Sequence, residues 1–171
     1  IHKSDRSAVI LAGGKSSRMG SDKGLTDFNG MEMVAYPIKL LKPLFREVFL
    51  IANSTAYRKF KIPVYEDLVK NSGPLAGIYT GLMHSSTAWN FFIACDMPLV
   101  KKDIIYSLAE SMDQYDAVVP LVNNRHEPMC AFYNKSAIPV IEKQLEEGKN
   151  KIQDIFPFLK LKSVDFSHLT A

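Results

Sequence analysis

Three unbroken apolar runs constrain the fold more strongly than any other feature of this sequence. They lie at Ala8–Leu11, Val48–Ala52 and Phe91–Cys95. A strand with one face in water alternates apolar and polar residues, so runs without alternation are typical of strands covered on both faces, as in parallel sheets. Further, shorter strands are expected at Pro63–Tyr65, Ala117–Leu121, Cys130–Tyr133 and Leu161–Val164.

Segments with apolar residues at helical spacing separate these runs. Helices are expected over Met33–Leu41, Ala76–His84, Lys102–Met112 and Ser136–Glu147. Ser136 is a candidate N-cap, Gly148 suits the position just after a helix, and Pro37 is tolerable only in a first turn. Strands that alternate with helices predict an α/β three-layer sandwich with a mainly parallel, Rossmann-like central sheet. In such sheets, ligands bind beyond the carboxyl ends of the strands.

The length and composition narrow the class of protein. A chain of 171 residues favours a single domain over 1–171, and a net charge of +3 is too small to indicate a nucleic-acid partner. Cys95 and Cys130 have no zinc-site spacing, suit a reducing cytosol and are expected to be small core residues. No apolar run approaches the ~20 residues that span a bilayer, and the N-terminus has no signal-peptide pattern. We expect a cytoplasmic monomer that binds neither nucleic acid nor membrane.

A glycine-rich segment follows the first apolar run. It reads Leu11-Ala12-Gly13-Gly14-Lys15-Ser16-Ser17-Arg18-Met19-Gly20-Ser21-Asp22-Lys23. Gly13 and Gly14 let backbone N–H groups approach an anion, while Arg18 and Lys23 add two cations, a combination that suits a triphosphate. It is not a P-loop, because Val9 stands where the first Gly belongs, and no G-x-G-x-x-G occurs. For the Gly-Gly pair alone, a solvated surface turn is the alternative.

The whole segment resembles the signature L-A-G-G-x-x-x-R-M-G-x-D-K of molybdenum cofactor guanylyltransferases. Three later blocks resemble the same family in the same order: Glu66-Asp67 with Gly73-Pro74-Leu75-Ala76-Gly77, then Cys95-Asp96-Met97-Pro98, then Glu127–Tyr133. The resemblance extends from about Ala8 to Asp165. It implies a sheet of the nucleotide-diphospho-sugar transferase type.

The resemblance also implies roles for individual residues. The candidate nucleotide-binding residues are Leu11, Ala12, Gly13, Gly14, Lys23, Asn53, Asp67 and Asp96, and the candidate catalytic residues are Arg18, Lys23 and Asp96. Asp96 would bind Mg²⁺, which prefers hard oxygen ligands; a helix N-cap before Pro98 is the alternative. Asn53 follows the second strand, although family members can carry their nucleotide-contacting Asn two positions earlier, where this chain has Ile51. A turn-forming Asn is the alternative there.

The implied reaction transfers GMP from GTP to the phosphate of molybdopterin or molybdenum-molybdopterin, with Mg²⁺ as cofactor and pyrophosphate as leaving group. GTP and molybdopterin (the molybdenum cofactor) are thus the implied partners, with other molybdenum cofactor proteins as candidates. Basic residues at Arg125, His126, Lys149 and Lys151 are candidates to face the acceptor phosphate. Arg125 and His126 are expected in a loop before Glu127-Pro128. A solvated face is the alternative for Arg125, Lys149 and Lys151, and a histidine without a chemical role is the alternative for His126.

Two other functions and one departure from the family stay open. A related nucleotidyltransferase would use CTP or another phosphorylated acceptor, and a non-catalytic adaptor would bind nucleotide and deliver cofactor. Family members usually continue past the last strand into an Asn-x-Asn-Thr-Pro-Glu-Glu segment, whereas this sequence stops at Ala171. Either the sequence is incomplete, or a late piece of the metal and acceptor site is absent.

Overall fold

A mixed sheet forms the centre of the molecule in the computed structural model, which describes residues 3–12 and 22–170. The sheet has eight strands in the order β10-β7-β9-β6-β1-β4-β5, with β8 paired to β7. Their bounds are β1 Ser4–Leu11, β4 Phe45–Ile51, β5 Val64–Tyr65, β6 Trp89–Ala94, β7 Ala117–Val122, β8 Arg125–His126, β9 Cys130–Asn134 and β10 Leu161–Asp165. Strands β6, β1, β4 and β5 run parallel, and β9 runs antiparallel to both β6 and β7. The predicted, mainly parallel sheet is confirmed.

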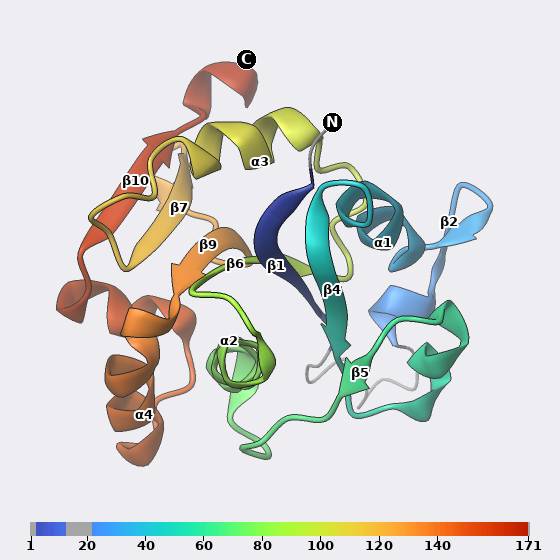
Figure 1. Cartoon of the computed structure of the whole chain (residues 1–171), viewed down its shortest axis with the longest axis horizontal. Helices are drawn as coiled ribbons and strands as arrows, with labels where there is room; N and C mark the ends of the chain where they lie inside the picture. The colour runs from blue at the N-terminus through green and yellow to red at the C-terminus, as the bar shows by residue number, and fades with distance from the viewer. Residues whose placement is uncertain (1–2, 13–21, 171) are drawn as a thin grey trace.

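Helices cover both faces of this sheet (Figure 1). They are α1 Ala35–Leu41, α2 Gly73–His84, α3 Lys102–Ala109 and α4 Ile138–Glu146. Helices α1 and α3 lie on one face, and α2 and α4 lie on the other, which confirms the three-layer sandwich. Shorter elements are β2 Asp27–Phe28, β3 Met31–Glu32 and the 3-10 helices η2 Lys23–Leu25, η3 Thr55–Phe60, η4 Lys135–Ala137, η5 Ile152–Phe158 and η6 Ser167–Thr170.

Two hydrophobic cores explain why the apolar runs are unbroken. Along β1, Ala8 and Ile10 belong to the core beneath α1 and α3, while Val9 and Leu11 belong to the core beneath α2 and α4. Successive side chains of a strand point to opposite faces, so a strand between two layers of helices needs an apolar residue at every position.

Helix α2 approaches the sheet closely through two glycines. A Cβ on Gly81 would lie 2.5 Å from the ring of Phe92 and 3.0 Å from Val9, and one on Gly77 would lie 3.1 Å from the Leu11 side chain. At Gly81 a larger residue would force the Phe92 ring or α2 to shift, whereas at Gly77 the Leu11 side chain would have to give by only a few tenths of an ångström. The last glycine of the G-P-L-A-G block, Gly77, thus packs directly over Leu11 of β1.

The start of α4 differs from the prediction. Ser136 is not its N-cap, because the α-helix begins at Ile138 after the 3-10 turn η4. The side chain of Asn134 caps that turn by accepting the Ser136 N–H at 2.9 Å, and the Ser136 hydroxyl donates to Asp116. Gly148 lies just after the helix as predicted, and its φ of +77° is in the left-handed region.

A hairpin replaces the loop expected around Arg125 and His126. These residues form β8, and Asn123 and Asn124 both have positive φ, 49° and 62°, in the turn that joins it to β7. Two consecutive residues with positive φ make a two-residue hairpin turn, and Asn accepts that conformation more readily than most residues. The Asn-Asn pair was the overlooked sequence signal.

The helix prediction at Pro37 is confirmed, because this residue lies in the first turn of α1.

Candidate functional site

Four neighbouring parallel strands end at one edge of the sheet. Leu11 pairs with Ala94 on one side and with Ile51 on the other, and Ile51 pairs with Tyr65. The residues that follow these strands include Ala12, Asn53, Asp67 and Asp96, so all four leave the sheet at the same carboxyl edge. Neighbouring strands are about 4.8 Å apart, so β6 and β5 lie about 14 Å apart across this edge. That span suits a ligand as long as a nucleoside polyphosphate.

The backbone at the end of β1 is held on both sides. Ala12 N–H donates to the carbonyl of Ile51 at 2.9 Å, and Cys95 N–H donates to the carbonyl of Leu11 at 2.9 Å. The chain thus enters the glycine-rich segment from a fixed position. Gly13, Gly14 and Arg18, three of the predicted site residues, lie outside the described residues.

Lys23 and Asp96 are brought together at this edge. Lys23 opens η2, Asp96 follows β6, and Nζ of Lys23 lies 3.8 Å from Oδ2 of Asp96. The two side chains are 64% and 38% exposed, and an exposed ion pair contributes only about 0–1 kcal/mol to folding. The pair is therefore not needed to hold the fold, and both charges are accessible to a ligand. Asp96 caps no helix, because α3 begins at Lys102 with Lys101 as its N-cap.

The turn that presents Lys23 is tied to the core by Asp22, a signature residue to which the sequence analysis gave no role, and by Tyr57, which it did not mention. Oδ1 of Asp22 accepts the Gly24 N–H at 3.2 Å and also accepts the hydroxyl of the fully buried Tyr57. Burial, followed by the hydrogen bond to Asp22, raises the pKa of Tyr57 well above its usual value, so this hydroxyl stays a donor. Asp before a short helix is a recognisable cap, whereas nothing local marks Tyr57.

Asn53 and Asp67 form a second pair, at the ends of β4 and β5. Asn53 Nδ2 donates to Asp67 Oδ2 at 3.1 Å, and Asp67 N–H donates to Asn53 Oδ1 at 3.1 Å. Nζ of Lys70 donates to Asn53 Oδ1 and to Glu66, at 3.2 and 3.1 Å. Ile51, the position where family members can carry an Asn, is buried in the core.

The Asp67 carboxyl keeps one acceptor uncommitted. Its Oδ1 atom is buried and has no hydrogen-bond partner among the residues that the structure describes. Burial raises the pKa of Asp67, and the Asn53 hydrogen bond and the charge of Lys70 act in the opposite direction. A buried acceptor without a partner is costly and suits a donor supplied by a ligand.

The candidate acceptor residues lie near the same edge but in separate places. The carbonyl of Asn150 accepts the Leu75 N–H at 3.2 Å, which sets Lys149 and Lys151 beside the start of α2. Gly73 permits this approach, since it has φ +65° and a Cβ there would lie 3.1 Å from that carbonyl.

Arg125 and His126 lie on β8, which follows the carboxyl end of β7. His126 contacts the Ser163 hydroxyl at 2.7 Å and stacks edge-on to Phe156. Within the described part of the chain, no hydrogen bond or ion pair joins either residue to Lys23 or Asp96.

The two cysteines are core residues, as predicted. Both are buried, and burial raises the pKa of each thiol to about 12, so they remain protonated. Cys130 lies in β9, while Cys95 lies one residue past β6 rather than at its last position. Among residues 3–12 and 22–170, no three His, Cys, Asp or Glu side chains are grouped as a metal site would require.

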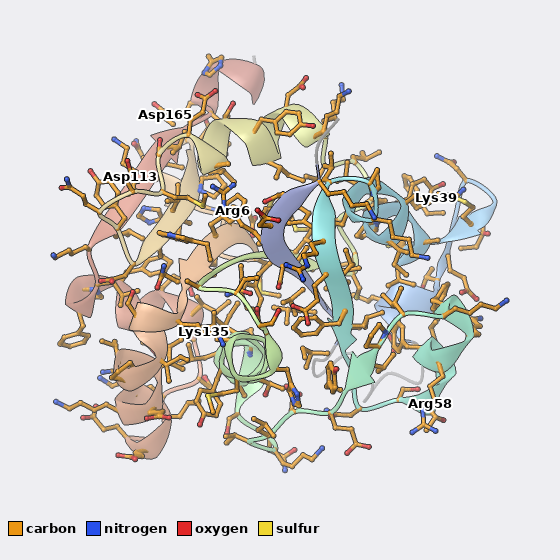
Figure 2. All side chains as sticks on the ribbon, viewed as in Figure 1. Arg6, Lys39, Arg58, Asp113, Lys135 and Asp165 are labelled. Atoms are coloured by element: carbon orange, nitrogen blue, oxygen red, sulfur yellow. The ribbon has the colours of Figure 1, made fainter. Side chains whose placement is uncertain are left out.

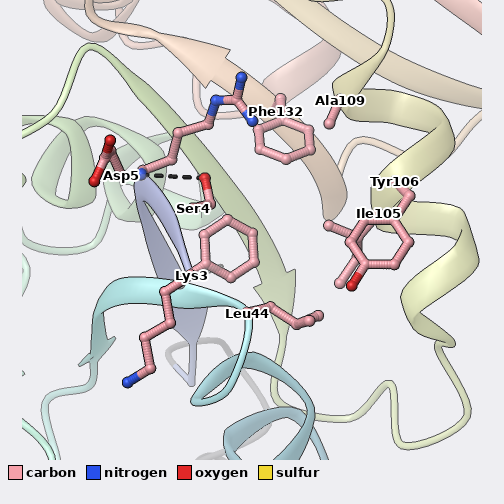
Figure 3. Close-up of a pocket in the computed structure, with 10 residues that line it drawn as sticks. Lys3, Ser4, Asp5, Leu44, Ile105, Tyr106, Ala109 and Phe132 are labelled. Atoms are coloured by element: carbon pink, nitrogen blue, oxygen red, sulfur yellow. Dashed lines mark hydrogen bonds between the residues drawn. The ribbon is translucent and has the colours of Figure 1, made fainter. Parts of the chain in front are cut away.

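A pocket of about 370 Å³ lies at the opposite, amino end of β1. Figure 3 shows it between the start of β1 and α3, with Tyr106 and Phe132 among its walls and with Lys3 and Asp5 at the strand end. None of the predicted site residues lines it. The polar carboxyl edge, rather than this hollow, is the candidate site.

Comparison with known proteins gives the family. The family model described as the MobA-like NTP transferase domain matches residues 8–163. The chain belongs to this family. This confirms the resemblance noted in the sequence.

Curated relatives and solved structures agree with that assignment. A probable molybdenum cofactor guanylyltransferase of Carboxydothermus hydrogenoformans is 40% identical over 161 residues, covering 94% of this chain and 82% of the relative. The molybdenum cofactor guanylyltransferase of Vibrio vulnificus is 35% identical over 164 residues, covering 93% and 84%. The molybdopterin-guanine dinucleotide biosynthesis protein A of Archaeoglobus fulgidus has the same fold, with a TM-score of 0.80, 23% identity and coverage of 95% and 85%.

A more distant solved structure shares the fold. A 4-diphosphocytidyl-2C-methyl-D-erythritol synthase of Anaerococcus prevotii superposes with a TM-score of 0.73 at 13% identity, covering 94% of this chain and 87% of that one. Together, the neighbours confirm the predicted sheet type. No helix in the described residues is long and apolar enough to cross a bilayer.

Proposed function

We propose that this protein transfers GMP from GTP to the phosphate of molybdopterin, forming molybdopterin guanine dinucleotide and releasing pyrophosphate. Support comes from its family and from relatives, 32–40% identical, that carry the name molybdenum cofactor guanylyltransferase. The observation that carries the proposal is the Lys23–Asp96 pair, exposed beside the end of β1 at the edge where the glycine-rich segment begins. We also propose that residues 1–171 form one domain and that the protein is a monomer in the cytoplasm.

Magnesium is part of the proposal, with Asp96 as its protein ligand. The residues present fit the ion, because the Asp96 carboxylate is accessible and its ion-pair contact with Lys23, at 3.8 Å, is longer than a hydrogen bond. Mg²⁺ commonly binds through one or two carboxylates plus substrate phosphates and needs no larger protein cluster. When bound, the ion would offset negative charge on phosphate oxygens.

The side chains have distinct tasks in this reaction. Lys23 and Arg18 would offset charge on the α-phosphate and on the leaving pyrophosphate, and the amides of Gly13 and Gly14 would fix the geometry of the nucleotide. The acceptor phosphate is already anionic near neutral pH, so no protein nucleophile is needed. Catalysis then depends on positioning and charge stabilisation.

Asp67 would contact the nucleoside and Asn53 its base or ribose, while backbone groups of Leu11, Ala12 and Gly13 would hold the nucleotide. The unpartnered Oδ1 of Asp67 suits an N–H or O–H donor of a base or ribose. A fixed acceptor that faces the base distinguishes guanine from cytosine, because the two bases carry their N–H donors at different positions. A comparison of GTP with CTP therefore tests the proposal directly.

The test is a pyrophosphate-release assay with GTP, CTP or ATP, each with and without molybdopterin and Mg²⁺. We expect release only with GTP, molybdopterin and Mg²⁺ together, and a product whose mass equals molybdopterin plus a guanylyl group. Faster turnover with CTP would assign the protein to cytidylyl transfer instead. Tight GTP binding without pyrophosphate release would favour the cofactor-delivering adaptor.

A further inference from the structure

The hydroxyl of Tyr57 reaches from the core to the turn that carries Lys23. Tyr57 lies on η3, is fully buried and packs near Phe60, with ring centroids 6.3 Å apart. Its hydroxyl donates to Oδ1 of Asp22, and the same oxygen accepts the N–H of Gly24 at 3.2 Å. One carboxylate oxygen therefore connects a core side chain to both residues that flank Lys23.

The turn has little room to move in this position. A Cβ on Gly24 would lie 2.5 Å from the Tyr57 hydroxyl oxygen and 3.0 Å from the sulfur of Cys95, which directly precedes Asp96. The carbonyl of Gly24 accepts the N–H of Val34 at 3.0 Å, so the turn is also tied on its other side. Gly24 thus lets the backbone sit directly against Tyr57 and the end of β6.

We infer that Tyr57 is a positioning residue for nucleotidyl transfer, holding Lys23 opposite Asp96 through its hydrogen bond to Asp22. Lys23 Nζ lies 3.8 Å from Asp96, and the long Lys23 side chain is itself 64% exposed. Its placement therefore depends on the backbone of the turn. A displacement of about 1 Å in a reacting constellation can cost about a hundredfold in rate, so this anchor affects kcat. The kinetic part of the inference rests on the proposed function.

Tyr57 would act as a fixed neutral donor and not as an acid or base. Burial and the neighbouring Asp22 hold its pKa far above the neutral range. Removing its hydroxyl should therefore lower kcat without moving the pH profile. A proton-transfer role would change that profile.

Hydrogen exchange tests the anchor without reference to activity. Tyr57→Phe removes only the hydroxyl, and we expect the Gly24 amide to exchange roughly tenfold faster, the effect of about one net hydrogen bond. Tyr36→Phe is the matched control, because its hydroxyl donates to the Phe28 carbonyl at 2.5 Å beside the small β2–β3 hairpin. Unchanged Gly24 exchange in Tyr57→Phe would overturn the inference, whatever the enzyme's substrates are.

A double-mutant cycle with Lys23→Ala tests the kinetic part. Tyr57→Phe alone should lower kcat by roughly tenfold to a hundredfold, and by less than about twofold once Lys23 is already Ala, because the two residues act as one unit. Asp22→Asn, which keeps an acceptor oxygen, should retain more activity than Asp22→Ala. Fully additive losses would show that Tyr57 acts elsewhere. If the wild-type protein shows no turnover, the proposed function is refuted. The exchange rate of the Gly24 amide still tests, independently of turnover, whether Tyr57 holds the turn.

Discussion

The two halves of the candidate site are built in different ways. On the phosphate side, formed by Lys23 and Asp96, an exposed ion pair stands on a turn fixed to the buried Tyr57 through Asp22. On the nucleoside side, formed by Asn53 and Asp67, two loop residues hold each other by reciprocal hydrogen bonds. Anchoring to the core gives precision, whereas mutual pairing of loop groups can adjust to a ligand. The phosphate side should therefore control rate, and the nucleoside side should control affinity.

The largest effect is expected from removing the carboxylate of the phosphate side. Asp96→Ala should lower Mg²⁺-dependent turnover by about a thousandfold or more, because it removes the proposed protein ligand of the ion. It also removes the carboxylate that contacts Lys23. The variant should stay folded, since an exposed pair adds little to stability. Pyrophosphate release and thermal melting measure the two quantities.

Asp113→Ala is the matched control for that variant. Asp113 lies on the exposed loop between α3 and β7, away from β4 and β5 (Figure 2). Wild-type turnover in Asp96→Ala would contradict the assignment of this carboxylate.

The lysine of the phosphate side should rank next. Lys23→Ala should reduce kcat by about 10²–10³, the range seen when a group that stabilises developing negative charge is lost. Lys39→Ala is the control, because Lys39 lies exposed on α1, outside the site (Figure 2). A raised KM with unchanged kcat would mean that Lys23 assists ground-state binding only, and the two halves of the site would no longer differ.

A smaller and different effect is expected on the nucleoside side. Asp67→Asn keeps an oxygen for Asn53 but loses the negative charge, so the KM for GTP should rise by about tenfold with kcat nearly unchanged. Steady-state kinetics with GTP as the varied substrate measures both constants. A loss of kcat as large as that of Lys23→Ala would abolish the distinction between the halves.

The smallest effect concerns stability against pH. Burial raises the pKa of Asp67 above its usual 3.8, so the folded protein takes up this proton at a higher pH than the unfolded chain. Between the two pKa values the folded state binds more protons, and the free energy of unfolding decreases as pH rises. The Tm of wild type minus that of Asp67→Asn should therefore fall as pH rises through this interval. A difference that grows with pH would contradict the direction of the shift, and Asp113→Asn serves as control.

Much of the fold followed from patterns within single segments. The unbroken run at Ala8–Leu11 predicted a strand covered on both faces, and the two cores on either side of β1 supply the reason. Element ends were less predictable, as at Ser136, because a nearby Asn134 competes for the same capping role.

The candidate site was predictable only in part. Residues at strand ends, such as Asp96, could be placed because parallel strands align their carboxyl ends. Tyr57 could not, since its partner Asp22 lies 35 positions away and only the folded chain brings them together. The pairing of Asn53 with Asp67 is of the same kind, because it depends on β5 lying beside β4.

A crystal structure with GTP and Mg²⁺ tests the central claim most directly. The account predicts that the nucleotide spans the carboxyl edge, with its phosphates at Lys23 and Asp96 and its nucleoside within hydrogen-bond distance of Oδ1 of Asp67. A nucleotide bound in the pocket at the amino end of β1, beside Arg6 and Tyr106, would contradict it.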